Sequence, residues 1–349
     1  VGGETEVGLT KSSVQPLFPL GASSGPPPEP PCPAVELAHT LGADYIEQDV
    51  VLTSDGVPIV LHDVTLELTT NVAALFPERH RDDGLFYAID FTLEEIKVLN
   101  AHERTDSQGN PVFPGRYSGT GVEFKVPTLA EEIETVDRLN AASGKRTGIY
   151  VELKRPEFHE QEGVDIYRAV LDVLIAFNRL GENAETVIQC FDPETLKRFA
   201  HEGIFKGPLV QLVLTESIAN WRGDFEGMHT MSGLKEVAEY AHGIGPDVSL
   251  LENMSGGPSE MVVAAKKLGL FLHPYTLRAD SESLPGVNFA ALHKKLFIDL
   301  EEDLFDRNRI YGGIGYKFFE GVNIELGYMN QFLGSLSRDQ INVIMLLNL

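Results

Sequence analysis

Cysteine, positive charge and long apolar runs are all scarce in this 349-residue chain. Its two cysteines, Cys32 and Cys190, are too few for a disulfide framework, and neither lies in a Cys-x-x-Cys or Cys/His metal spacing. No window reaches the roughly 18 consecutive apolar residues that a transmembrane helix needs. We therefore expect no disulfide-dependent fold, no thiolate metal site and no transmembrane helix.

Positive charge is outnumbered, since 28 Lys and Arg face 52 Asp and Glu, for a net charge of −24. Nucleic acids and anionic membranes bind proteins through Lys and Arg, so we expect neither as a partner. An anionic small molecule would need local positive charge, which a bound divalent cation could supply. The chain begins at Val1 without a charged segment and an apolar run, so we expect any export signal to be absent or already removed.

A β-hairpin is the clearest local feature of the sequence. Residues 45–53 and 57–61 are rich in β-branched and apolar side chains, and Ser-Asp-Gly separates them. An Asp-Gly pair between two such runs is a strong hairpin signal. If Asp55 and Gly56 form a two-residue loop, Ser54 lies opposite Val57.

Polar side chains share one face of this hairpin. In the two-residue register Asp49 lies opposite His62, and the alternation of a strand places Glu47 on the same side. The other face is apolar, which fits a barrel wall with chemistry on its inner side. The alternative is a hairpin whose polar face is simply solvated.

A second polar pair ends the strand expected at residues 148–153. Glu152 and Lys154 share a face by the period of two. A carboxylate and an ammonium aimed the same way suit a metal site that also binds phosphate. The alternative is a structural Glu/Lys pair at the end of a strand.

The middle of the chain alternates between strands and helices, which indicates parallel βαβ units. The pattern predicts helices at residues 34–41, 163–180, 193–201, 234–242 and 259–268, and strands at 187–190, 209–214, 248–251 and 271–274. Another helix is expected to begin at Thr128, as N-cap, with Glu131 as its capping-box partner.

Residues 42–63, GADYIEQDVVLTSDGVPIVLHD, resemble the core of the glycerophosphodiester phosphodiesterase family. The family pattern is roughly Gly-Ala-Asp-hydrophobic-Glu-x-Asp, then Thr-x-Asp-Gly, then hydrophobic-His-Asp. The resemblance extends over about residues 34–306. It implies an α/β fold, a (β/α)8 TIM-type barrel, with an inserted loop and helix region at about 63–147 after the second strand.

The resemblance also implies a site. Glu47, Asp49 and Glu152 would bind a divalent cation, and carboxylate oxygens favour Ca²⁺ or Mg²⁺ over zinc. His62 would be one of two acid/base histidines. Lys154, in the family's Glu-x-Lys, would stabilise charge on the phosphate.

Further residues are candidates for substrate binding. Gln189 and Phe191 resemble the family's Gln-Ser-Phe-Asp strand end, with cysteine in place of serine. Gln211, His273 and Arg278 either line the substrate site or have a plain structural role, and the sequence does not distinguish these two alternatives.

Both ends of the chain depart from the family pattern. Residues 1–33 are rich in proline and glycine and predict an irregular arm, in which Pro19 and Leu20 occupy the place of the family's His-Arg. Residues 307–349 predict strands, which could complete the barrel, in place of the family's barrel-closing strand and helix. Their alternating glycine and aromatic residues resemble the closing strands of an outer-membrane-type β-barrel protein. The strand-like runs lie at 311–318, 322–332 and 340–349.

The resemblance implies metal-dependent hydrolysis of glycerophosphodiesters to sn-glycerol 3-phosphate and an alcohol. The alternative is a catalytically impaired member that binds metal or phosphodiester without efficient turnover, because the first His-Arg is not found. The acidic surface and the similarity to exported family members suggest a periplasmic or secreted protein.

The missing His-Arg leads to a prediction about turnover. Loss of one of two acid/base groups commonly costs a factor of about 10²–10⁴, so hydrolysis of glycerophosphocholine should be slow and should recover when Pro19→His and Leu20→Arg are combined. Steady-state rates of the two chains measure the difference. Turnover of the unaltered chain at about 1–10³ per second would contradict this expectation.

Overall fold

The structure, a computed structural model, describes residues 33–112, 123–254 and 258–276 and the backbone of three strands between 309 and 347. The chain divides into two compact units, whose described parts are residues 33–276 and the three later strands. In the described part of the chain, no helix has the length and apolarity to cross a membrane.

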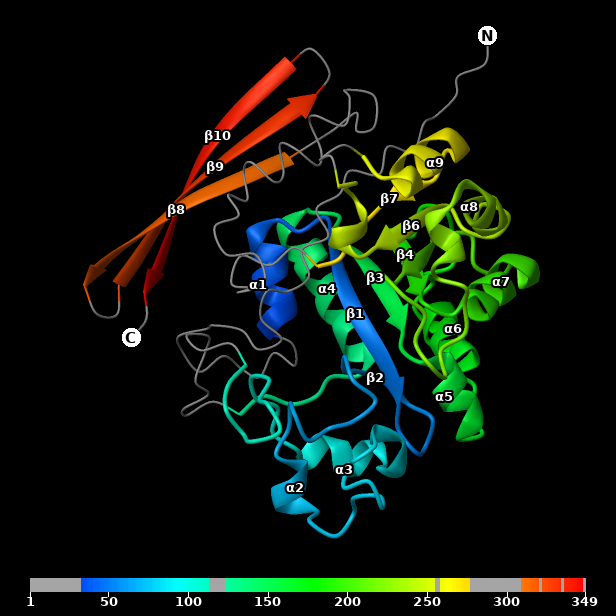
Figure 1. Ribbon diagram of the computed structural model, residues 1–349. Helices are drawn as coiled ribbons and strands as arrows, with labels where there is room; N and C mark the ends of the chain where they lie inside the picture. The colour runs from blue at the N-terminus through cyan, green and yellow to red at the C-terminus, as the bar shows by residue number, and fades with distance from the viewer. Residues whose placement is uncertain are drawn as a thin grey trace. The chain divides into compact units, whose positions relative to one another are not determined.

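The first unit is built on a seven-stranded sheet with the order β2-β1-β3-β4-β5-β6-β7 (Figure 1). Only the β1–β2 pair is antiparallel, and all other neighbours are parallel. The strands are β1 (Tyr45–Leu52), β2 (Pro58–Val60), β3 (Gly148–Leu153), β4 (Thr186–Cys190), β5 (Leu209–Val213), β6 (Gly243–Pro246) and β7 (Phe271–Leu272).

This sheet curves back on itself. Tyr150 lies on β3 and His273 directly follows β7, so three strands separate them in the sheet. Nevertheless, the Tyr150 hydroxyl lies 2.7 Å from Nδ1 of His273 in a buried hydrogen bond. These parallel strands follow one another in chain order, and side chains from strands far apart in the sheet meet in its interior. That is the arrangement of a barrel wall and not of a doubly wound open sheet. The predicted α/β fold of TIM-barrel type is confirmed.

Helices follow the parallel strands as βαβ units require. Figure 1 shows α1 and α4 lying next to one another beside β1, and the two helices are in contact. The α-helices are α1 (Pro33–Leu41), α2 (Val72–Leu75), α3 (Leu93–Val98), α4 (Leu129–Ser143), α5 (Pro156–Gln161), α6 (Ile166–Ala176), α7 (Pro193–Glu202), α8 (Met231–Val237) and α9 (Glu260–Leu268). Short 3-10 helices are η1 (Ala88–Asp90), η2 (Gly227–His229) and η3 (Val248–Leu250).

The strand predicted at residues 248–251 is wrong. That segment forms η3, which begins after Asp247, whose side chain accepts from the Ser249 N–H. The strand lies earlier, in the Gly-Ile-Gly-Pro of β6. A side chain at Gly243 would come within 2.1 Å of Phe271, and one at Gly245 within 2.6 Å of Leu212. Glycine is needed for this close packing, and it also removes the β-branched signal by which a strand is recognised.

The predicted hairpin forms, but its register differs by one residue. Val50 pairs with Val60 and Leu52 with Pro58, so Asp49 lies opposite Leu61 and not opposite His62. The loop has three residues, because Thr53 pairs with Val57 and Gly56 adopts the left-handed conformation with φ of 75°. This is the three-residue hairpin in which a type I turn ends in a left-handed glycine.

The region inserted after β2 has its own apolar core. Leu66, Phe86, Phe91 and Leu99 pack there with residues of the β1–β2 hairpin. The predicted capping box at Thr128 is confirmed: Thr128 Oγ1 accepts from the Glu131 N–H, and the Glu131 carboxylate accepts from the Thr128 N–H. This cap begins α4, the helix that leads back to the barrel at β3.

The C-terminal unit is an antiparallel sheet of β8 (Arg309–Phe319), β9 (Val322–Leu333) and β10 (Leu336–Leu347) in the order β10-β9-β8. These strands agree with the runs expected from the sequence. They form a three-stranded sheet of their own. Residues 1–32, with the predicted arm, lie outside the described residues.

A buried histidine connects β1 to the segment after β3. His159 on α5 accepts the Leu52 N–H at Nε2 (3.1 Å), and its Nδ1 lies 3.0 Å from the Arg155 carbonyl. An N–H can only donate and a carbonyl can only accept, so this histidine is neutral with its proton on Nδ1. Burial lowers the pKa of His159 below its ordinary 6.5, although the backbone hydrogen bonds act in the opposite direction.

This arrangement predicts how stability depends on pH. Below the unfolded-state pKa of 6.5 the unfolded chain binds more protons at His159 than the folded chain, so stability is lost as pH falls from 6.5 through the lower folded pKa. His159→Leu should reduce the free energy of unfolding near pH 7.5 by about 1–3 kcal/mol, because the Leu52 N–H loses its partner, and should weaken this pH dependence.

Urea unfolding between pH 5 and 7.5 measures both effects, with the exposed His201→Gln as the matched control. Some pH dependence should survive in the variant, because burial also lowers the pKa of His39 and His242. A His159→Leu protein with the unchanged pH slope would contradict the assignment.

Candidate metal and phosphodiester site

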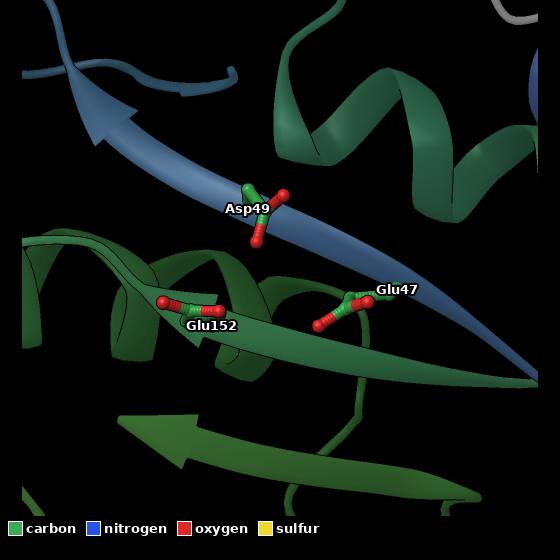
Figure 2. Close-up of side chains that lie close together, drawn as sticks. All are labelled: Glu47, Asp49 and Glu152. Atoms are coloured by element: carbon green, nitrogen blue, oxygen red, sulfur yellow. The ribbon is translucent and has the colours of Figure 1, made fainter. Parts of the chain in front are cut away.

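Three carboxylates gather at adjacent strands of the barrel. Glu47 and Asp49 project from β1 and Glu152 from β3, and the parallel register places Asp49 directly opposite Glu152 (Figure 2). One ligand oxygen from each lies within 4.8 Å of the others. The predicted convergence of these three side chains is therefore present, and the spacing would allow all three to reach one cation.

Lys154 supplies positive charge to this group. Its Nζ lies 2.8 Å from Glu152 Oε1 and 3.7 Å from Asp49 Oδ1, and the side chain is almost completely buried. Burial would lower the pKa of Lys154, but the charges of Asp49 and Glu152 raise it above the ordinary value. Lys154 therefore stays charged.

One ammonium does not balance three carboxylates. Burial, together with the charges of Asp49 and Glu47, raises the pKa of Glu152 to about 8 despite the nearby Lys154. Burial would also raise the pKa of Asp49, but Lys154 and His62 lower it. A carboxyl that holds a proton near neutral pH indicates that the site has too little positive charge, so a bound cation would be favourable there. The donor set of hard oxygens fits a divalent cation of the Ca²⁺ or Mg²⁺ kind.

His62 lies within electrostatic reach of Asp49 although the strand register differs from the prediction. Strand β2 ends at Val60, so His62 is placed by the following bend and not by the hairpin ladder. Its charge contributes to the lowered pKa of Asp49. The side chain is 60% exposed, and its Nδ1 lies 2.6 Å from Asp63 Oδ1. An exposed imidazole next to a carboxylate cluster can exchange protons with a bound molecule.

Gln189 and Phe191 stand near the site from the end of β4. The Gln189 amide donates to Glu47 Oε1, which orients that carboxylate. Phe191 is half-buried at the centre of an aromatic group, with ring centroids 5.1 Å from Trp221 and 5.6 Å from Tyr275. The charges of Glu152 and Lys154 act, after burial and Asp247, on the pKa of Tyr275, so this aromatic residue is within electrostatic reach of the site.

Two of the remaining candidates for substrate binding make hydrogen bonds within the protein. Gln211 is fully buried, accepts from the Tyr240 hydroxyl (2.8 Å) and donates to the Phe191 carbonyl (2.9 Å), which favours the structural alternative. His273 is buried against Tyr150 in the barrel interior. Arg278 lies outside the described residues.

Sequence reasoning missed Asp63, which contacts His62, and Arg104, which contacts Asp63. Asp63 follows His62 in the chain, and Arg104 comes from the inserted region with its guanidinium 2.6 Å from the second oxygen of Asp63. The His-Asp dipeptide was a visible signal for Asp63. No sequence signal pointed to Arg104, because it is 41 positions beyond Asp63 in a segment without regular structure.

Two curated bacterial relatives named glycerophosphodiester phosphodiesterase are similar to most of the chain. The protein from Haemophilus influenzae is 34% identical over 282 residues, which cover 74% of this chain and 78% of the relative. The protein from Treponema pallidum is 34% identical over 273 residues, with 72% and 76% covered.

Comparison with solved structures supports the fold. A phosphodiesterase from Oleispira antarctica, solved in complex with the product sn-glycerol-3-phosphate, matches with a TM-score of 0.50 and 20% identity. The match covers 78% of this chain and 84% of that one. At this level of identity, the likeness shows the shared fold.

Family models divide the chain into two matched regions. Residues 286–342 match a family described as a protein of unknown function (DUF2490), so the resemblance of the tail to outer-membrane strands stays a prediction. Residues 22–299 match the glycerophosphoryl diester phosphodiesterase family. The well-matched relatives and the carboxylate site at the barrel strands agree with this larger match. The chain belongs to the glycerophosphoryl diester phosphodiesterase family.

Proposed function

We propose that this protein hydrolyses glycerophosphodiesters to sn-glycerol 3-phosphate and an alcohol with the help of a bound divalent cation. The observation that carries the proposal is the meeting of Glu47, Asp49 and Glu152 with Lys154 at neighbouring parallel strands. The named activity of the two bacterial relatives and the product bound to the Oleispira protein support it.

Carboxylates would hold the cation in this site. Glu47, Asp49 and Glu152 provide the oxygens, and Gln189 orients Glu47 by its hydrogen bond. When bound, a Ca²⁺ or Mg²⁺ ion polarises a phosphoryl oxygen and neutralises charge that develops on it. Glu47, Asp49 and Glu152 would thereby hold the local positive charge that an acidic protein needs for an anionic substrate.

Lys154 and His62 supply the other chemistry of hydrolysis. The buried ammonium of Lys154 stabilises negative charge on the phosphate oxygens, and burial strengthens this interaction relative to water. His62 donates its Nδ1 proton to Asp63, so Nε2 is the nitrogen that can take or give a proton at a bridging or attacking oxygen.

The direct test is product formation from glycerophosphocholine. Release of sn-glycerol 3-phosphate should occur with Mg²⁺ or Ca²⁺, stop after treatment with a chelator and return when the cation is restored. Absence of product with either cation, in a protein that is folded by circular dichroism, would refute the proposed hydrolysis.

Cation binding should also stabilise the folded protein. A ligand present at 100 times its Kd adds about 2.7 kcal/mol to the free energy of unfolding, so the Tm should rise with Mg²⁺ or Ca²⁺. Glu152→Gln should abolish this rise. It should not lower the Tm without cation, because the raised pKa keeps the carboxyl of Glu152 largely protonated near pH 7.

The exposed Asp172 on α6 provides the control, since Asp172→Asn removes a surface carboxylate that pairs with Arg168. Its thermal response to the cation should equal that of the unaltered chain. A Tm rise that persists in Glu152→Gln would place the cation elsewhere.

Lys154 can be tested separately from the cation. Lys154→Met should lower kcat by about 10²–10³, the range for loss of one group that stabilises developing charge. The Tm response to the cation should remain, since the three carboxylates are intact. Lys197→Met, at an exposed lysine paired with Glu194, is the control. An unchanged kcat in Lys154→Met would remove this residue from the reaction.

A further inference from the structure

A chain of polar contacts leads from the inserted region to His62. Asp63 Oδ1 lies 2.6 Å from His62 Nδ1, and Asp63 Oδ2 lies 2.6 Å from Arg104 Nη1. Each carboxylate oxygen therefore has its own partner. Burial would raise the pKa of Asp63, but its hydrogen bonds with His62 and Arg104 and the charge of Arg104 lower it well below the ordinary value. Asp63 stays anionic and can accept from both neighbours.

His62 needs such support because little packing restrains it. Its side chain is 60% exposed, whereas those of Asp63 and Arg104 are 27% and 26% exposed. An exposed imidazole rotates freely unless a hydrogen bond fixes it, and a fixed Nδ1–H also determines the tautomer. The ion pair with Arg104 restricts the rotation of the Asp63 carboxylate that provides this bond.

The backbone around Arg104 is itself anchored. The Arg104 carbonyl accepts from the Val112 N–H (2.9 Å), and the Thr105 N–H donates to the Leu68 carbonyl (2.9 Å). Next to this segment, the His102 N–H donates to the Thr69 carbonyl (2.8 Å). These bonds fix the backbone at Arg104 relative to the segment that follows β2. Arg104 can therefore act as a fixed support for Asp63.

We propose that Arg104 of the inserted region is a positioning residue that holds Asp63, and through it the His62 imidazole, in the orientation that proton transfer requires. The proposal rests on the hydrolytic function proposed above. It gives the inserted region a role in the reaction without contact between Arg104 and the substrate.

Arg104→Met, which keeps the length of the side chain but removes its charge, tests this role. The kcat for glycerophosphocholine should fall by about 10–100-fold, as for other outer partners that orient a functional histidine, while KM and the cation-dependent Tm rise stay unchanged. Arg104→Lys should recover part of the loss, because an ammonium can still pair with Asp63. Arg79→Met removes a comparable arginine that pairs with Glu95 in the same region, and should leave kcat unchanged.

A double-mutant cycle separates positioning from a general structural effect. His62→Asn removes the imidazole. If Arg104 acts only through His62, then Arg104→Met added to His62→Asn should change kcat by less than about twofold, a difference no larger than that between independent sites. An equal loss of kcat with and without His62 would overturn the proposal. If Arg104→Met fails to fold, the same cycle is performed with Arg104→Lys.

Nuclear magnetic resonance provides a readout that does not need activity. In ¹⁵N-histidine-labelled protein, the ring nitrogens of His62, assigned from the signals missing in His62→Asn, should show a proton on Nδ1. Arg104→Met should change this tautomer pattern, and Arg79→Met should not. An unchanged His62 pattern in Arg104→Met would overturn the positioning role. Absence of hydrolysis in the unaltered chain would instead refute the proposed function, and the spectra would still decide the role of Arg104.

Discussion

The parallel pairing of β1 with β3 is the constraint on which the site depends. It places Asp49 opposite Glu152 and aligns both with the end of the strand that carries Lys154. The ends of parallel strands lie at one edge of a barrel, where side chains from different strands can meet. The carboxylate group is therefore a consequence of the register, and a shift by one residue would turn these side chains to the opposite face.

The same pairing brings together charges that oppose one another. Three clustered carboxylates, of which Glu152 is buried and the other two are partly buried, with one ammonium are less favourable for stability than an apolar cluster of the same size. The cost appears as the raised pKa of Glu152, while the surrounding barrel wall, with Ile46, Val50 and Val151, is completely buried and apolar. A site with unbalanced charge, supported by a well-packed wall, is what binding of a cation and a phosphodiester requires.

The inserted region packs against the barrel and contributes to the surroundings of His62. Its apolar core includes Val51 and Ile59 of the β1–β2 hairpin, so the hairpin and the inserted region fold against each other. Arg104 then reaches Asp63 just beyond that hairpin. The orientation of His62 therefore depends on residues from two distant parts of the sequence. The barrel strands alone do not provide these contacts.

The sequence predicted the local features correctly: the hairpin, the capping box at Thr128, and the carboxylates with Lys154, because strand periodicity and short motifs act over a few residues. It did not determine the register of the hairpin, because the left-handed Gly56 makes a three-residue loop as compatible with Ser-Asp-Gly as a two-residue loop. Strand β6 could not be recognised from the sequence either, because close packing against Phe271 and Leu212 requires glycine at positions where a strand usually carries β-branched residues. Only the tertiary structure brought Arg104 to Asp63, because contacts between residues far apart in the chain follow from packing and leave no periodic signal in the sequence.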